Sequence, residues 1–599
     1  MTPEYYIDIE TESLTPKTIW CVGVEDSEGN YEEFRDAKSL RDYASSVASG
    51  TWYAHNGIKF DYPVLRNLWD IDISHYGTQR DTMVMSKLAT PRRDGGHSLD
   101  NVGALVGHRK IDFHDYSRYS EEMSKYLRQD CKVLGAVVSL LHRELRQFSE
   151  DSVALEHKVA EIIHQQELNG WLLDAKGAYE LLGTLKEKIN DATKIVHDTF
   201  RPKATLVKEI TPKVKKDGSL SVVGLKCYGD HATKIVGGPF SRIEWQELNL
   251  GSGPQVAERL VNAGWKPKEF TEKTKVPVVN YETLEEASTA IPEAKAIYDF
   301  LLLDKRRSQV EQWIQYLGPN DRVHGRVNPM GAVTGRMTHN SPNVAQVPSC
   351  DAPWGHECRS LWIAPEGYCI VGADASGLEL RMLAHYMDDP EYIQEILSGD
   401  IHWANTLALG FFKEGTIRVT DEEHPDYQEH EHYRNIAKTF IYALIYGAGS
   451  AKIGGIIGGG YTEGEYMKAR FLEAFPALGA LITKVHRIAS NSGSVPGLDG
   501  RRIPVDSLHS ALNRLLQGGG AIVMKKALTI YDEYSKLWSL DAHRVGNIHD
   551  EMQDQVLKAH ANKAGYLMVE SIKAAGTQLN MRCPLDGEYK TGPSWAETH

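Results

Sequence analysis

Two adjacent carboxylates, Asp550 and Glu551, interrupt the strand-like stretch NIHDEMQDQV at 547–556. A buried charge without a partner costs several kcal/mol, so few acids are found inside a sheet. The stretch therefore folds either as a solvated hairpin tip or around a bound cation. The second alternative requires another carboxylate from elsewhere in the chain.

A candidate partner for Asp550 is Asp374. The segment YCIVGADASGLELRMLAHYM at 368–387 predicts a buried strand that runs into a helix, with Asp374 at the carboxyl end of the strand. Open α/β folds place ligand-binding groups at that end. If this strand neighbours the hairpin, Asp374 and Asp550 face each other across a pair of metal ions.

A stripe of cations and aromatic rings lies between these two segments. Arg434, Lys438, Tyr442 and Tyr446 follow one another at intervals of four residues. In a helix this interval drifts by only about 40° per step, so the side chains share one face. The stripe suits a nucleoside triphosphate, with the cations toward phosphates and the rings against base and sugar. His402 is a further candidate phosphate contact, although a single histidine is more often structural.

A second group of acids lies in the first 150 residues. Asp8 and Glu10 are two apart in a strand-like segment, Asp61 follows, and Tyr126 and Asp130 are four apart in a helix-like segment. Four carboxylates can hold two divalent ions about 3.5–4 Å apart, which suits in-line attack of water on a phosphodiester. Tyr126 is a candidate for orienting that water.

This ordered pattern resembles the DEDDy family of 3′–5′ exonucleases. Asp8 and Glu10 match its first motif, Asp61 its second, and Tyr126 with Asp130 its third. The resemblance implies an RNase H-like domain in which the four carboxylates hold two Mg²⁺ ions. Because none of the expected carboxylates is missing, we predict an active exonuclease.

The later segments together resemble family A DNA polymerases, the DNA polymerase I family. DASGLELR matches motif A, R-x(3)-K-x(3)-Y-x(3)-YG matches motif B, and HDE matches motif C. NPMGAVTGRMTHNSPNVAQVP, LDGRRIP and ALNRLLQGGGA are also similar to family segments. The compact size, the lack of a 5′-nuclease domain and the ending GPSWAETH look most like replicative polymerases of podovirus-type phages.

The resemblance to family A implies site residues. Asp374, Asp550 and the Ala375 carbonyl are expected to hold two Mg²⁺ ions, with the catalytic candidate Glu551 beside them. Glu379 is expected to block a ribose 2′-OH. The implied dNTP-binding residues are Ala375, Glu379, His402, Arg434, Lys438, Tyr442 and Tyr446. The implied contacts to primer–template DNA are Arg336, Asn513, Gln517 and His549.

Basic segments offer further DNA contacts although the net charge is −14. Residues 301–340 hold six Arg and Lys against three acids, and residues 201–240 hold eight against three. Lys305 and Arg306 lie on one amphipathic helix and are DNA-binding candidates, with a solvated charged face as the alternative. The basic insertion at 203–240 includes a strand-like run at 219–228 and lies where some phage relatives dock a processivity factor.

Residues 421–432, DEEHPDYQEHEH, depart from the family pattern just before the motif B helix. The spacing of their acids and histidines suggests a metal site as one alternative, but the segment lacks the fixed geometry that such a site needs. We therefore predict a solvated loop.

Composition excludes several classes of protein. The chain is 41% hydrophobic and 25% charged, without a run of about 18 apolar residues, which predicts a globular protein with no membrane span. The N-terminus lacks the features of a signal peptide. The seven cysteines include no C-x-x-C pair, which indicates a reducing compartment. We expect a cytoplasmic protein, in an infected bacterial host if a phage encodes it.

The length of 599 residues predicts about three to five domains. We expect an α/β and α+β multidomain fold, with an RNase H-like exonuclease domain at 1–150 followed by a right-hand polymerase. The expected parts of the hand are a thumb at 151–318 with its basic insertion at 203–240, palm at 319–390, fingers at 391–507, and palm again at 508–599.

The predicted function is a DNA-dependent DNA polymerase with 3′–5′ proofreading, acting by two-metal-ion nucleotidyl transfer. The implied partners are primer–template DNA, dNTPs, a processivity factor at the thumb insertion and a replisome helicase-primase. A single-subunit RNA polymerase is one alternative, and Glu379 and the exonuclease argue against it. A non-catalytic DNA-binding scaffold is the other, and the complete carboxylate sets argue against that.

Overall fold

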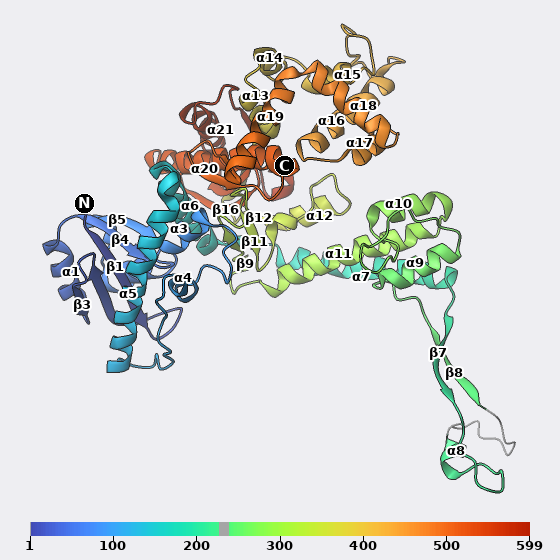
Figure 1. Ribbon diagram of the computed structural model, residues 1–599, viewed down its shortest axis with the longest axis horizontal. Helices are drawn as coiled ribbons and strands as arrows, with labels where there is room; N and C mark the ends of the chain where they lie inside the picture. The colour runs from blue at the N-terminus through green and yellow to red at the C-terminus, as the bar shows by residue number, and fades with distance from the viewer. Residues whose placement is uncertain (1, 227–238, 599) are drawn as a thin grey trace. The chain divides into compact units, whose positions relative to one another are not determined.

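The computed structural model describes residues 2–226 and 239–598, and the chain divides into two compact units. The first unit is Met1–Leu173 with Tyr316–His599, and the second is Asp174–Gln315. Both mix helices with small sheets (Figure 1). The second unit begins later than the thumb boundary expected at 151, because α6 (Glu150–Asn169) packs against α20 (Ala511–Leu537) and β16 (Ala542–Ile548) of the first unit.

A mixed five-stranded sheet begins the first unit. Its order is β3-β2-β1-β4-β5, with β1 antiparallel to β2 and parallel to β4. Strand alternation buries Ile7 and Ile9 on one face of β1 and places Asp8 and Glu10 on the other. The elements are β1 (Glu4–Thr11), β2 (Ile19–Asp26), β3 (Tyr31–Phe34), β4 (Gly50–Ala54), β5 (Gly77–Asp81), α1 (Ala37–Ser46), α2 (Asp61–Trp69), α3 (Thr82–Ala89), α4 (Leu99–Leu105) and α5 (Glu121–Glu144).

An antiparallel four-stranded sheet carries the second group of candidate site residues. Its order is β16-β17-β13-β18, so the strand predicted at 368–375 does neighbour the predicted hairpin. The apolar run Cys369–Ala373 is buried, and α20 and α21 pack into the same core. The remaining elements are β13 (Tyr368–Ala375), β17 (Glu551–Leu557), β18 (Gly587–Gly592), α13 (Leu378–Met387) and α21 (Ala561–Gln578).

Short strands and two short helices complete this region. The small three-stranded sheet has the order β12-β6-β9, and β10 pairs with β11. The elements are β6 (Trp171–Leu173), β9 (Arg322–Val323), β10 (Arg326–Asn328), β11 (Thr338–Asn340), α12 (Gly355–Ser360), β12 (Trp362–Ile363) and the 3-10 helix η7 (Trp595–Thr598).

The expected fingers segment is mainly helical. It comprises α14 (Pro390–Ser398), α15 (Ile401–Leu409), α16 (Tyr427–Ile445), α17 (Ser450–Ile456), α18 (Tyr461–Ala474), α19 (Pro476–Ser492), β14 (Ser494–Pro496) and β15 (Arg502–Pro504). The prediction of a solvated loop at 421–432 is wrong for its second half, because α16 already begins at Tyr427. His430 is buried against the Trp403 ring, and its Nδ1 accepts the Val419 N–H at 3.0 Å.

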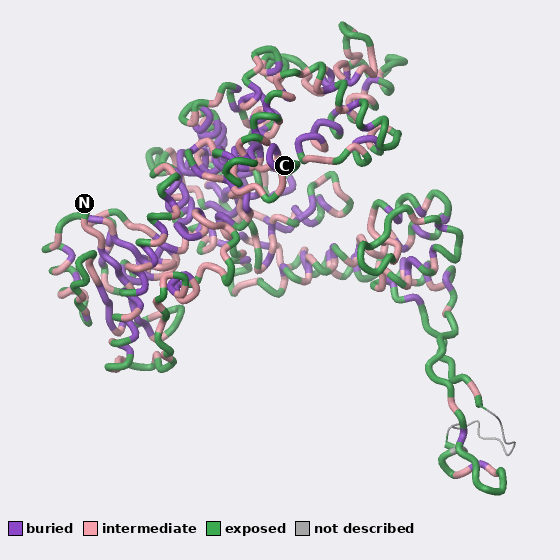
Figure 2. The backbone as a smooth tube through the Cα atoms, in the orientation of Figure 1, coloured by how far each residue is buried: buried purple, intermediate pink, exposed green. Residues whose placement is uncertain are grey.

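The second unit is a helical body with a long two-stranded hairpin. Its elements are α7 (Ala175–Thr199), β7 (Lys203–Ile210), α8 (Val222–Lys226), β8 (Phe240–Gln246), α9 (Gly253–Asn262), α10 (Tyr281–Ala290) and α11 (Ala294–Gln315). The strand predicted at 219–228 is wrong, because 222–226 is the short helix α8; residues 227 and 228 lie outside the described residues. β7 and β8 flank that helix and are exposed along most of their length (Figure 2).

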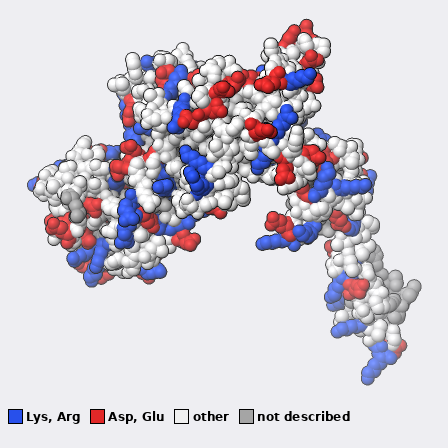
Figure 3. Space-filling view, turned by 45° about the horizontal axis from the view of Figure 1, so that its top comes forward, with Lys and Arg blue, Asp and Glu red and all other residues white. Residues whose placement is uncertain are grey.

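The hairpin and its adjoining loop expose basic side chains, some of which are visible in Figure 3. Those exposed are Lys203, Lys208, Lys213, Lys215, Lys216 and Arg242. Within residues 2–226 and 239–598, no helix is both long enough and apolar enough to cross a membrane.

A buried ionic network joins α6 to α20 and to the turn between β14 and β15. Glu156 on α6 accepts hydrogen bonds from Lys525 Nζ at 2.6 and 2.7 Å and from Arg501 Nη1 at 2.5 Å. Asp499 binds the other side of Arg501, at 2.6 Å from Nη2. All four side chains are at most 4% exposed. The network therefore satisfies charges that the core would otherwise leave unpaired.

Glu156→Gln should destabilise the first unit by about 3–5 kcal/mol, because it leaves buried Lys525 without its charged partner. The measurement is the midpoint of urea unfolding followed by tryptophan fluorescence. Glu161→Gln is the matched control on α6, since the Lys158–Glu161 pair is 36% and 46% exposed and should contribute less than about 1 kcal/mol. Equal losses in both variants would contradict the interpretation of the buried network.

Candidate functional site

The two aspartates predicted to share a metal pair lie at adjoining strand ends. Asp374 is exposed near the end of β13 and is paired in register with Glu551 of β17. Asp550 lies in the turn between β16 and β17, and its carbonyl accepts the Ala375 N–H at 3.2 Å. His549 in the same turn has a left-handed φ of 59°, which is uncommon for a residue other than glycine. The structure thus brings together segments that are 175 residues apart.

The electrostatics of Asp550 favour a bound cation. Burial raises the pKa of Asp550, the charge of Glu379 raises it further, and Arg336 and His549 oppose this effect. A carboxylate that is costly to ionise alone is stabilised by a divalent cation. Carboxylates and a backbone carbonyl are also the oxygen ligands that Mg²⁺ prefers. Asp374, Asp550 and the Ala375 carbonyl therefore form a donor set that fits the metal ions expected from the sequence.

Glu551, expected beside the metals, is engaged by protein groups. It is 5% exposed, and its Oε1 accepts hydrogen bonds from Trp595 Nε1 at 2.6 Å and from Gln553. Arg359 Nη1 lies 3.9 Å from the same oxygen. These contacts tie η7 and α12 to the start of β17. We interpret Glu551 as a support for the Asp550 turn.

The predicted stripe lies on α16, whose last residue is Ile445; Tyr446 follows as the C-cap. The Tyr446 hydroxyl donates to Glu379 on α13, at 2.8 and 2.7 Å from its two carboxylate oxygens, and Arg336 Nη2 binds the same carboxylate at 3.2 Å. Burial raises the pKa of half-buried Tyr442, and the charges of Glu379 and Asp550 raise it further. The helix α16 and its C-cap therefore present Tyr442 and Tyr446 to the Asp550 end of the four-stranded sheet.

The cationic part of the stripe lies on the preceding turns of α16. Arg434 Nε donates to Asp400 at 2.8 Å, whereas Lys438 is exposed. The His402 ring lies 6.3 Å from that of Tyr442. Burial, together with the charges of Arg434 and Lys438, lowers the pKa of His402 to about 4. His402 is therefore neutral near pH 7 and can donate a hydrogen bond without carrying charge.

The predicted DNA contacts have different environments. His549 is exposed in the turn beside Asp550, and half-buried Asn513 and Gln517 lie one turn apart on α20. In the second unit, Lys305 is exposed with its ammonium 5.5 Å from the Tyr281 ring. Arg306, the other DNA-binding candidate on this helix, is buried instead. It is 6% exposed, and its Nη1 donates to Gln309 at 3.1 Å, so little of its side chain is open to a DNA phosphate.

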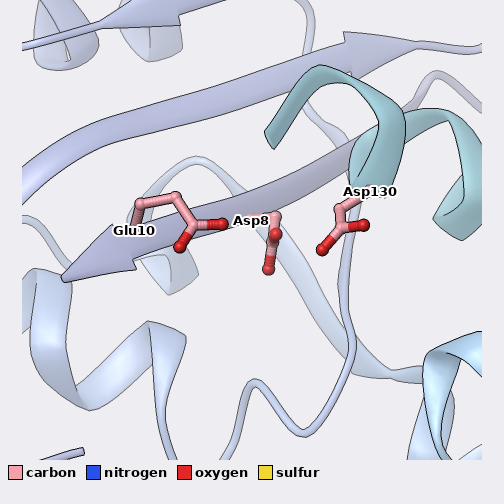
Figure 4. A group of neighbouring side chains, drawn as sticks. All are labelled: Asp8, Glu10 and Asp130. Atoms are coloured by element: carbon pink, nitrogen blue, oxygen red, sulfur yellow. The ribbon is translucent and has the colours of Figure 1, made fainter. Parts of the chain in front are cut away.

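The acids of the first sheet form a compact cluster. Carboxylate oxygens of Asp8, Glu10 and Asp130 all lie within 4.8 Å of one another (Figure 4). Asp61 at the start of α2 is 3% exposed. Burial is the largest cause that raises the pKa of Asp8, and the charges of Asp61 and Asp130 raise it further. Burial is also the main cause that raises the pKa of Glu10 to about 8 and that of Asp61 to about 7. These acids fit divalent cations for the same reason as Asp550.

Lys110 is a residue of this cluster that the sequence did not point out. Its Nζ lies 2.5 Å from Asp130 and 4.9 Å from the centre of the Tyr126 ring. Tyr126 is held by stacking on Phe113, with ring centres 5.4 Å apart. Lys110 precedes α5 in an irregular segment without periodicity, so only its basic character was visible in the sequence.

Asp8→Asn should stabilise the metal-free protein at alkaline pH. A carboxyl whose pKa is raised on folding costs stability as the pH rises from its unfolded pKa of about 4 to its folded pKa, which here is about 7 for Asp61 and about 8 for Glu10. In EDTA the Tm of the wild type should therefore fall between about pH 5 and pH 8 and level off above that, and that of the variant should fall less, by about 2–4 °C.

The Tm of both proteins is measured with EDTA and with Mg²⁺. Mg²⁺ should raise the Tm of the wild type at the alkaline end and that of Asp8→Asn much less. Exposed Asp112 supplies the control, and Asp112→Asn should behave as the wild type. A variant with an unaltered pH profile and an unaltered Mg²⁺ response would count against a metal site at Asp8.

Comparisons with known proteins agree with this arrangement. The family model described as DNA polymerase family A matches residues 231–597. The DNA-directed DNA polymerase of Escherichia phage T7 is 30% identical over 93% of this chain and 93% of its own, and that of Enterobacteria phage T3 is 30% identical over 99% of each. The DNA polymerase I of Aquifex aeolicus is 26% identical over 100% of this chain and 96% of its own.

A solved structure shows the same fold. It is the POL domain of Pol1 from M. smegmatis in complex with DNA primer-template and dNTP, with a TM-score of 0.76 and 18% identity, covering 99% of this chain and 96% of that chain. Because the family model spans more than half of the residues, the chain belongs to DNA polymerase family A.

Proposed function

We propose that this protein is a DNA-directed DNA polymerase that extends a primer on a DNA template and removes mismatched ends by 3′–5′ hydrolysis. The observation that carries the proposal is the meeting of Asp374 and Asp550 at one end of the palm sheet, next to Glu379 and Tyr442. Two acids that can hold metal ions, beside a Tyr442 side chain that can face the sugar of a nucleotide, suit nucleotidyl transfer.

Family A polymerases use divalent metal ions, and we assign two Mg²⁺ ions to Asp374, Asp550 and the Ala375 carbonyl, and two to Asp8, Glu10, Asp61 and Asp130. When bound, such ions supply Lewis-acid stabilisation of phosphoryl oxygens and lower the pKa of an attacking hydroxyl or water. Both sites are rich in acids whose pKa burial raises, and bound divalent cations would stabilise the ionised forms of these acids.

In the polymerase site, the protein's part is to bind and orient the nucleotide. Arg434, Lys438 and His402 bind the triphosphate, and Tyr442 faces the sugar. Glu379 is held by Tyr446 and Arg336, which fixes its carboxylate where an added 2′-OH would clash. Asn513, Gln517 and His549 contact the primer end, and Lys305 contacts the template duplex. In the exonuclease site, Tyr126 orients the attacking water.

The partners proposed for this chain follow from the same assignment. Primer–template DNA and dNTPs are the substrates, in keeping with the complex in which the M. smegmatis neighbour was solved. The exposed basic hairpin of the second unit is the proposed docking point for a processivity factor, and a replisome helicase-primase is a further partner. Since phage polymerases are among the relatives, we place the protein in the cytoplasm of an infected bacterium.

Asp550→Asn should lower primer extension more than about 100-fold, because the amide removes the negative charge that the nucleotidyl-transfer site requires. The same variant should still degrade single-stranded DNA from its 3′ end. The reciprocal control is the double variant Asp8→Ala, Glu10→Ala, which should extend primers but not degrade them. Primer extension and degradation of end-labelled DNA in Mg²⁺ measure both. Normal extension by Asp550→Asn would refute the palm assignment.

Tyr442→Phe should increase discrimination against dideoxynucleotides by at least about tenfold, with little loss of dNTP use. A hydroxyl facing the sugar can replace a contact that a normal dNTP makes through its own 3′-OH, so the wild type should accept ddNTPs readily. The measurement is the ratio of kcat/KM for dNTP over ddNTP in the Asp8→Ala, Glu10→Ala background. A high ratio in the wild type that Tyr442→Phe leaves unchanged would show that Tyr442 does not face the sugar.

A further inference from the structure

One carboxylate in the fingers is shared by two arginines. Asp400 Oδ2 accepts Arg434 Nε at 2.8 Å and Arg418 Nη1 at 2.7 Å. The other oxygen of Asp400 caps α15 by accepting the N–H groups of His402 at 3.1 Å and Trp403 at 3.2 Å. Asp400, Arg418 and Arg434 are between 22% and 25% exposed, so solvent screens this arrangement only partly.

Further contacts hold Arg418 in place beside Asp400. Its guanidinium also binds Glu431 on α16, with Nε at 3.0 Å from Oε1. The next residue, Val419, donates its N–H to buried His430 of the same helix. Arg418 is thus anchored to α16 just before Arg434, and it comes from the segment 410–426 that links α15 to that helix.

The two guanidiniums compete for one oxygen. Under the proposed function, Arg434 must leave Asp400 to bind the triphosphate, and breaking a charge-assisted hydrogen bond opposes nucleotide binding. A second cation on the same oxygen weakens the hold of Asp400 on Arg434. It also keeps the carboxylate neutralised once Arg434 has turned away, so this partly exposed charge is not left unpaired.

We propose that Arg418 is a positioning residue for nucleotide binding, which releases Arg434 from Asp400 to the triphosphate. The inference rests on the proposed role of Arg434 and deepens it. Arg418 itself stays with Asp400 and Glu431 and does not touch the substrate. Arg418 is expected to affect only the affinity for phosphate groups, so substituting it should weaken the binding of each of the four dNTPs and of pyrophosphate by the same factor.

Arg418→Gln should raise the KM for dNTP about 5- to 10-fold, because Asp400 then holds Arg434 alone. The kcat at saturating dNTP should change less than about twofold, since the bound complex is assembled as before. Steady-state single-nucleotide extension measures both, and pyrophosphorolysis gives the apparent affinity for pyrophosphate, which should weaken by the same factor. Arg418→Lys keeps a cation beside Asp400 and should retain most of the wild-type KM.

A second substitution tests the competition itself. Asp400→Asn keeps a good N-cap for α15 but removes the charge that holds Arg434. Added to Arg418→Gln, it should return the KM to that of Asp400→Asn alone. The matched control is Arg582→Gln, which breaks an Arg–Asp pair with Asp388 of similar length, 2.8 Å, outside the fingers, and should leave the KM unchanged.

The outcomes separate this inference from the proposed function. An unchanged KM in Arg418→Gln, a loss confined to kcat, or a failure of Asp400→Asn to suppress the KM effect would each overturn the role of Arg418. If Arg434→Gln also leaves the KM unchanged, the assignment of Arg434 to the triphosphate is wrong as well. The lysine variant gives one more decisive outcome. If Arg418→Lys has the wild-type Tm but a KM as high as that of Arg418→Gln, a cation beside Asp400 is not enough to release Arg434, and the proposed role of Arg418 is wrong.

Discussion

The antiparallel pairing of β13 with β17 is the constraint on which the proposed polymerase site depends. It sets Asp374 opposite Glu551 and brings the Ala375 amide to the Asp550 carbonyl. Gathering acids in one place is unfavourable, and here the cost is offset by the buried run Cys369–Ala373 and the core around it. The site is therefore a strained electrostatic arrangement that an apolar core holds in place and that a divalent cation would relieve.

The same physical solution occurs a second time in the first sheet. There β1 carries Asp8 and Glu10 on one face, and α5 packs across that face with Asp130. Each acid cluster belongs to a different sheet with its own core. Substitutions at one cluster should therefore leave the geometry of the other intact, as the proposed separation of synthesis from proofreading requires. The buried Glu156 network connects the helix between these sheets to the palm without involving either cluster.

The fingers depend on shared ionic partners. Glu379 is shared by Arg336 and Tyr446, and Asp400 by Arg418 and Arg434. Under the proposed function Glu379 itself lies beside the sugar, whereas Asp400 holds Arg434, which must turn to the triphosphate. Shared partners can be exchanged at small cost, because a carboxylate that loses one donor keeps the other. Such exchange suits a site whose residues must turn from protein partners to substrate.

Periodicity and spacing in the sequence determined the local elements: the strand of Asp8 and Glu10, the strand before Asp374, the hairpin at Asp550 and the helix that aligns Arg434 with Tyr442. These follow from side-chain alternation, which is a property of neighbouring residues. Tertiary structure alone decided that Arg306 is buried, that α16 begins at Tyr427, and that 222–226 is a helix. It also decided that Lys110 joins the acid cluster of the first sheet and that Arg418 shares Asp400. Burial and ion pairing depend on residues far apart in the chain, and a local pattern carries no information about which distant residue will be the partner.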